Sequence, residues 1–141
     1  MTGRDRVSAG YSGTPLARKL GINAGHTVVV LGDPGLFGDI VAPLPPGVTI
    51  RTTAGGSANV AVFFTKERRL LERRIATLGR LIYPAGALWV AWPKRASKVA
   101  TDMTEDVVRQ VVLPLGMVDV KVAAIDETWS GLKVVWRTER R

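Results

Sequence analysis

The chain has 141 residues, 46% of them hydrophobic, and a formal net charge of +8 from 20 Lys and Arg against 12 Asp and Glu. This length predicts one domain with a sizeable core. The absence of cysteine excludes disulfides, thiolate zinc sites and thiol nucleophiles. No apolar run approaches a membrane span, and residues 1–8 are polar with no apolar segment behind them, so we expect a cytoplasmic protein without a membrane partner.

The predicted organisation is a flexible arm at residues 1–10 and one domain at residues 11–141. A short helix opens the domain, because Thr14 can cap it, Pro15 suits its first position and Gly21 suits its C-terminal turn. The other predicted elements are strands at 26–31, 48–52 and 59–65, a helix within 66–82, a strand at 87–92, a helix with its apolar face at 107–115, and strands at 118–125 and 132–138.

The strand at residues 87–92 organises the rest of the chain. It is apolar on both alternating faces and stops at Pro93, which predicts a strand covered by helices on both sides of a parallel sheet. A helical pattern precedes it and another follows it, so the unit is strand, helix, strand and the class is α/β. The last two strands, joined by residues 126–131, predict a terminal β-hairpin.

The sequence does not fix the direction of the second strand, at residues 48–52, within the sheet. The link from it to the third strand is shorter than the dozen residues that a parallel crossover normally needs. Either the second strand is not parallel to its neighbours, or an extended loop replaces the usual helix.

Two resemblances follow from these patterns. The order of strand, helix, Pro-Ala-Gly turn, strand, helix and antiparallel hairpin over residues 59–137 resembles the second half of the Rossmann-like S-adenosylmethionine-dependent methyltransferases. It implies an α/β fold of the reduced Rossmann-like type, a three-layer sandwich whose mostly parallel sheet ends in an antiparallel β-hairpin.

The second resemblance covers nearly the whole chain. It is carried by AGYSGTPL at 9–16, GALWVAWPK at 86–94, TDMTED at 101–106, VDVKV at 118–122 and DETWSGLK at 126–133. Together these motifs resemble a small bacterial family known as domain of unknown function 3052. That family carries no known activity, so the resemblance implies a fold and no particular function.

The chain departs from the methyltransferases where their cofactor sits. In those enzymes the first strand runs into an acidic residue and a G-x-G loop, and the second strand ends in an acid that holds the ribose hydroxyls. Here Gly32, Gly35 and Gly38 are three residues apart, and the second strand ends at Arg51. We therefore predict no cofactor, with S-adenosylmethionine as the disfavoured alternative, and interpret the glycines first as turn residues.

A ligand site is expected at the carboxyl ends of the strands, as in open α/β sheets generally. If the strands that begin near residues 59, 87 and 118 are parallel, this edge gathers cations for an anionic group, acids that balance them and an aromatic face for a ring. The candidate ligand-binding residues are Gly32, Asp33, Gly35, Lys66, Lys94, Arg95, Ser97, Asp126 and Trp129. The alternative is a solvated rim in which Asp126 and Glu127 pair with Lys94 or Arg95.

Other residues are interpreted as structural. His26 begins its strand, at the opposite edge from the expected site, and one His without Cys predicts no metal site. Trp89 and Trp92 are expected in the core. A cluster of arginines could bind phosphates, but no nucleic-acid motif accompanies it, so we interpret the cluster first as a solvated helix face. Its members are Arg68, Arg69 and Arg73, with Arg140 and Arg141 at the end of the chain.

Three functions from different classes remain. The first is a non-enzymatic binding or regulatory domain whose carboxyl-edge loops hold a small anionic ligand or a protein partner. The second is a minimal methyltransferase-like group-transfer enzyme in which Lys66, Lys94 and Asp126 orient a substrate. The third is a non-specific nucleic-acid binder driven by net charge, which should depend steeply on salt. The sequence favours the first and leaves the oligomeric state open.

Overall fold

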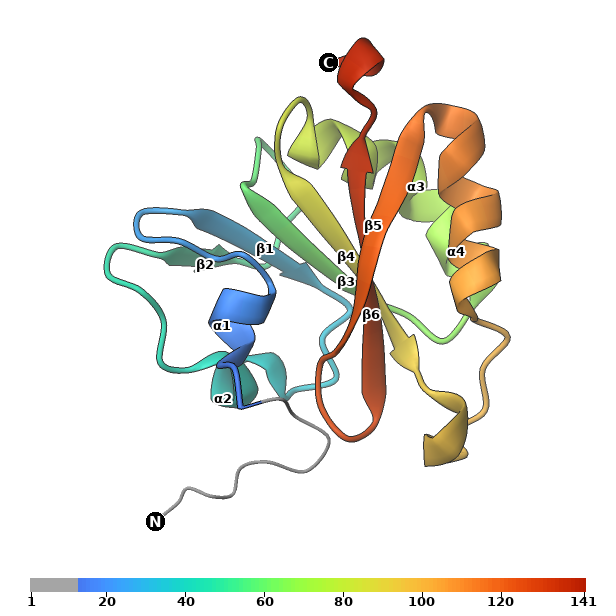
Figure 1. Cartoon of the computed structure of the whole chain (residues 1–141), viewed down its shortest axis with the longest axis horizontal. Helices are drawn as coiled ribbons and strands as arrows, with labels where there is room; N and C mark the ends of the chain where they lie inside the picture. The colour runs from blue at the N-terminus through green and yellow to red at the C-terminus, as the bar shows by residue number, and fades with distance from the viewer. Residues whose placement is uncertain (1–12) are drawn as a thin grey trace.

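The computed structural model describes residues 13–141, so the arm predicted at residues 1–10 lies outside the described residues. Six strands form one sheet in the order β2-β1-β3-β4-β6-β5 (Figure 1). The strands are β1 Thr27–Leu31, β2 Thr49–Arg51, β3 Val60–Phe64, β4 Ala87–Pro93, β5 Met117–Ala124 and β6 Trp129–Trp136. The α-helices are α1 Leu16–Lys19, α2 Phe37–Val41, α3 Arg68–Ile82 and α4 Glu105–Val112, and the 3-10 turns are η1 Arg95–Ser97, η2 Leu113–Leu115 and η3 Thr138–Arg140.

The sheet is parallel across four strands and antiparallel at one end. β2, β1, β3 and β4 run in the same direction, β6 runs against β4, and β5 runs against β6. β5 therefore points the same way as β4, and the predicted terminal hairpin is confirmed. A shift in register between Asp119 and Lys121 marks a bulge in β5, the outer strand of that hairpin.

Helices cover both faces of the sheet, which gives the three layers that were predicted (Figure 1). α3 and α4 pack on one face through a cluster that contains Leu71, Leu78 and Val108, and α1 and α2 pack on the other through a cluster that contains Leu20 and Phe37. The hydrophobic effect drives this burial, because each helix presents one apolar stripe that must leave water.

β4 is buried on both sides because it lies between β3 and β6 under both helix layers. Trp92 joins the cluster under α3 and α4, whereas Trp89 joins the cluster under α1 and α2. The indole Nε1 of Trp89 donates a hydrogen bond to the carbonyl of Leu20 at 3.1 Å, so its one polar atom is satisfied. The prediction that both tryptophans are core residues is confirmed.

The second predicted strand is parallel to its neighbour, and a loop connects it to the third. β2 is parallel to β1 at the sheet edge, and the chain reaches β3 through irregular backbone, so an extended loop does replace the usual helix. The Arg51 guanidinium holds this loop by donating to the carbonyls of Thr53 and Ser57, each at 3.3 Å, and to that of Gly55.

A candidate binding cleft at the carboxyl edge of the sheet

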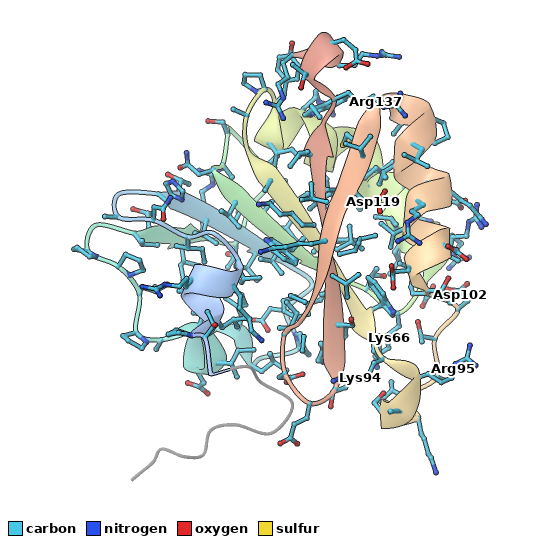
Figure 2. The ribbon with its side chains drawn as sticks, in the orientation of Figure 1. Lys66, Lys94, Arg95, Asp102, Asp119 and Arg137 are labelled. Atoms are coloured by element: carbon cyan, nitrogen blue, oxygen red, sulfur yellow. The ribbon has the colours of Figure 1, made fainter. Side chains whose placement is uncertain are left out.

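The carboxyl ends of β1, β3, β4 and β5 lie at one edge of the sheet, because these strands share a direction. Figure 2 shows Lys66, Lys94 and Arg95 at this end of the molecule and Arg137 at the opposite end. The expected gathering of loops is therefore present. The structure shows what each candidate residue does there, whereas ligand binding by them stays a prediction.

The loop after β1 is shaped by its own side chains. Gly32 has φ +72, and a Cβ on it would lie 2.4 Å from the carbonyl oxygen of Phe64 at the end of β3. One carboxylate oxygen of Asp33 accepts the backbone N–H groups of Gly35 at 2.9 Å, Leu36 at 3.0 Å and Phe37 at 3.2 Å. The Asp33 carboxylate thus accepts the N–H groups that could otherwise bind an external anion.

The loop after β3 joins the two helices of one layer. The carbonyl of Lys66 accepts the hydroxyl of Thr101 at 2.6 Å and the N–H of Asp102 at 3.3 Å. In return, the Asp102 carboxylate accepts the N–H of Arg68 at 2.7 Å, at the start of α3. Asp102 therefore caps the start of α3 rather than α4, and Thr104 caps α4 by accepting the N–H of Val107.

The turn between β5 and β6 uses Asp126 and Trp129 structurally. Asp126 accepts the N–H groups of Thr128 at 2.8 Å and Trp129 at 2.7 Å, which is the arrangement of an Asx turn. Trp129 is only 6% exposed, and its ring meets that of Phe64 edge to face at 5.1 Å. The expectation of an aromatic face for a ligand ring is wrong at Trp129, because burying this large apolar ring completes the core under α1 and α2.

A cleft of about 730 Å³ opens beside the end of β4. It lies between η1 with the segment that follows it, the first turns of α4, and Ser130 at the start of β6. Its lining residues are Trp92, Pro93, Lys94, Arg95, Lys98, Val99, Ala100, Thr101, Met103, Thr104, Glu105, Asp106, Arg109 and Ser130. Two of the predicted candidates, Lys94 and Arg95, line it.

One side of the cleft is cationic. We call Lys94, Arg95 and Lys98 the cationic wall; no ion pair within residues 13–141 involves any of them. Ser97 shapes this wall, since its hydroxyl donates to the carbonyl of Lys94 at 2.7 Å and accepts the N–H of Val99 at 3.2 Å. Lys98 ends η1 with φ 62, a conformation that is uncommon for a residue with a side chain.

Another part of the cleft lining, at the start of α4, is acidic. We call Glu105 and Asp106 in the first turn of α4, together with Arg109, the acidic wall. Arg109 donates to Glu105 at 2.5 Å, to Asp106 at 2.9 Å and to Asp119 of β5 at 3.0 Å. The hydrogen bonds to Asp119 and Glu105 raise the pKa of Arg109, and the one from Arg109 lowers the pKa of Asp119. Arg109 and Asp119 are therefore both charged at neutral pH.

Sequence pattern alone did not single out the acidic wall. The signal was there, because Arg109 follows Glu105 by four residues and Asp106 by three on one helix face. What the chain alone could not show is that this face turns toward the end of β4 and toward Asp119.

On the α1 side of the edge, a second lysine approaches Lys94. The Lys19 ammonium donates to the carbonyl of Ala124 at 3.3 Å. Burial lowers the pKa of Lys19, and the positive charge of Lys94 lowers it further.

Replacing Asp119 by Asn should lower the free energy of unfolding at pH 7 by up to about 1 kcal/mol, because a partly exposed pair is screened by solvent. The pKa of Asp119 is lower in the folded chain, so this stabilisation is present above the unfolded-state pKa and is lost as the pH falls through the folded-state pKa. Urea unfolding at several pH values measures the effect. A deficit of Asp119→Asn that stayed the same down to pH 2 would contradict the assignment.

The two cofactor contacts that the methyltransferase resemblance implies are altered here, where Asp33 follows β1 and Arg51 ends β2. Arg51 stands at the end of β2, and a guanidinium has no acceptor for a ribose hydroxyl. Arg51 is also engaged by the loop carbonyls that follow it, and Asp33 is engaged by its own turn.

Other classes of site are limited by the structure. Within residues 13–141, no group of three or more His, Cys, Asp and Glu side chains could hold a metal ion. No helix in that part of the chain is long and apolar enough to cross a membrane. His26 accepts the N–H of Asn23 through Nδ1 at 3.1 Å, in a turn before β1. On α3, Arg68 and Arg69 pair with Glu72 and Glu67.

Comparison with known proteins shows the fold and no closer relationship. No family model matches the chain, and no curated protein matches it. The resemblance to domain of unknown function 3052 therefore stays a prediction.

Similar solved structures are methyltransferases and related proteins. A SAM-dependent methyltransferase from Aquifex aeolicus is 13% identical, with 84% of this chain and 86% of that chain covered and a TM-score of 0.56. A pre-rRNA processing protein, the fibrillarin of Methanococcus jannaschii, is 11% identical, with 82% of this chain and 68% of that chain covered and a TM-score of 0.55. Magnesium protoporphyrin IX methyltransferase from Synechocystis PCC 6803, solved with bound SAM, is 12% identical. The match covers 86% of this chain and 74% of that chain, with a TM-score of 0.56.

These similarities define the class of the fold as Rossmann-like and methyltransferase-like, over most of the chain rather than its second half alone. At this level of identity they carry the fold and not the activity. Some of these proteins were solved with SAM or SAH, so the prediction that the chain binds no cofactor is not confirmed.

Proposed function

We propose that this chain is a small group-transfer domain of the methyltransferase type, whose substrate carries an anionic group and binds in the cleft at the end of β4. The observation that carries this proposal is the cationic wall, which places three positive charges without an intramolecular ion pair, among the described residues, on one side of a cleft of about 730 Å³. That volume lies in the range of small-molecule sites.

The position of the cleft supports the proposal. In open α/β sheets ligands bind beyond the carboxyl ends of the strands, and the cleft begins where β4 ends. Lys98 supports it too, because residues held in sparsely populated backbone conformations cluster at functional sites. Lysine and arginine together suit a phosphate or carboxylate, which they hold through charge-assisted hydrogen bonds.

Group transfer is preferred to passive binding because several proteins of the same fold are methyltransferases, some of them solved with SAM or SAH. An adenosyl donor would need contacts other than a carboxylate at the end of β2.

The test is a thermal-shift screen of the chain with inorganic phosphate, pyrophosphate, acetate, S-adenosylmethionine and S-adenosylhomocysteine. A ligand present at a hundred times its Kd stabilises by about 2.7 kcal/mol, which raises the Tm by several degrees in a domain of this size. We expect phosphate or pyrophosphate to raise the Tm, and the Arg95→Ala variant to lose most of that shift.

Lys121→Ala is the matched control, since Lys121 is an exposed cation on β5 that does not line the cleft. It should keep the shift. A shift with the adenosyl compounds would support the transferase, and a shift with anions alone would support a binding domain. Anion shifts that Arg95→Ala and Lys121→Ala reduced equally would show charge-driven surface binding and overturn the proposed site.

A further inference from the structure

The two walls of the cleft carry opposite charges. The cationic wall contributes three positive charges from Lys94, Arg95 and Lys98. The acidic wall contributes Glu105 and Asp106, whose side chains are 44% and 82% exposed. The walls come from different segments, one from the end of β4 and η1, the other from the first turn of α4.

Arg109 does not neutralise the acidic wall. It is one guanidinium shared among three carboxylates, those of Glu105, Asp106 and Asp119. Within the cleft lining, where Asp119 has no part, the two acids exceed Arg109 by one negative charge. Asp106 is the most exposed of the three acids, and its contact with Arg109 leaves the second carboxylate oxygen available to another donor.

A purely anionic ligand therefore matches the cationic wall and leaves the acidic wall without a partner. It would gain from Arg95 and Lys98 but would be repelled by Asp106 on the other side. A purely cationic ligand meets the reverse problem. A molecule with an acid at one end and an ammonium group at the other gains at both walls, and specificity in a charged site comes from this kind of complementarity.

We infer that the substrate of this cleft is a small zwitterion, whose acid group binds the cationic wall and whose ammonium group binds the acidic wall near Asp106. This inference rests on the proposed function, because it names the substrate class of the same cleft. Two chemistries share the required pattern, an amine-bearing phosphate ester and an amino acid.

Isothermal titration calorimetry with three matched probes tests the inference. Phosphoethanolamine carries both charges, ethyl phosphate carries only the anion, and ethanolamine carries only the cation. We expect phosphoethanolamine to bind about five-fold more tightly than ethyl phosphate, the gain of one partly exposed ion pair. Ethanolamine should bind more weakly than either.

Two substitutions separate the walls. Asp106→Asn should remove the five-fold advantage of phosphoethanolamine without weakening ethyl phosphate, and Arg95→Gln should weaken both phosphate probes. Asp39→Asn is the control for the first, because Asp39 is an exposed acid on α2 that does not line the cleft. Glu105 and Asp119 still hold Arg109 in Asp106→Asn, so α4 should remain in place.

The possible results separate the zwitterion inference from the proposed function. Equal affinities for phosphoethanolamine and ethyl phosphate would overturn the zwitterion inference and leave the anion site standing. An advantage that survived Asp106→Asn would also overturn it. If neither the phosphate probes nor the corresponding carboxylates, β-alanine and propionate, bound, the proposed function would fail as well. Replacing the phosphate probes by β-alanine and propionate repeats the comparison for a carboxylate and distinguishes the two chemistries.

Discussion

Gly32→Ala is expected to lower the free energy of unfolding by about 3 kcal/mol. Two costs add. A left-handed backbone costs a residue with a Cβ roughly 1–2 kcal/mol, and a steric clash costs roughly 1–3 kcal/mol. The clash is with backbone, since the new Cβ would lie 2.4 Å from the carbonyl oxygen of Phe64. Neither β1 nor β3 can move away easily, because they are paired from Val28 to Leu31.

Gly35→Ala is the control, and urea unfolding is the measurement. Gly35 also has positive φ, at +99, but a Cβ there meets nothing within 4 Å. This variant should lose only the backbone cost, about 1–2 kcal/mol. Equal losses in the two variants would show that the loop after β1 gives way, and would contradict the close approach of Gly32 to the end of β3.

Trp89→Ala is expected to cost more, about 3–5 kcal/mol, which is a large part of the stability of an ordinary domain. Trp89 is fully buried at the centre of the sheet, and its ring lies against Gly131 of β6, where a Cβ would come within 3.2 Å of it. Its removal leaves a cavity between α1 and β4 and a carbonyl at Leu20 without its donor.

Trp89→Phe separates packing from the hydrogen bond. It keeps an aromatic ring and loses the Nε1 donor, so the free energy of unfolding should fall by about 1–3 kcal/mol, less than in Trp89→Ala. Urea unfolding followed by far-UV circular dichroism compares the two. A loss below about 1 kcal/mol in Trp89→Ala would contradict the place of this side chain in the core.

The elements themselves were largely predictable from local pattern. The all-apolar run of β4 predicted a strand covered on both faces, and the apolar spacing of α3 predicted a helix, because periodicity reports which faces leave water. The short link after β2 left its direction open. Only the structure shows that an extended loop, held by Arg51, carries the chain to β3.

The candidate site was predictable in position and less so in detail. Strand direction placed Lys66, Lys94 and Arg95 at one edge, and that edge has a cleft. Trp129 looked available as an aromatic face because a turn residue is usually exposed, whereas packing against Phe64 buries it. Side-chain burial depends on contacts between residues far apart in the chain, which local pattern does not contain.

The sequence by itself determined the class of fold, because hydrophobic periodicity and turn residues act over a few neighbouring positions. The tertiary structure decided the site. It placed α4 so that Glu105 and Asp106 line the same cleft as the cations beyond β4, tied Arg109 to Asp119 across layers, and engaged Asp33 and Arg51 in their own loops. Charge complementarity is a property of distances in space, and those distances exist only once the sheet and its helices have packed together.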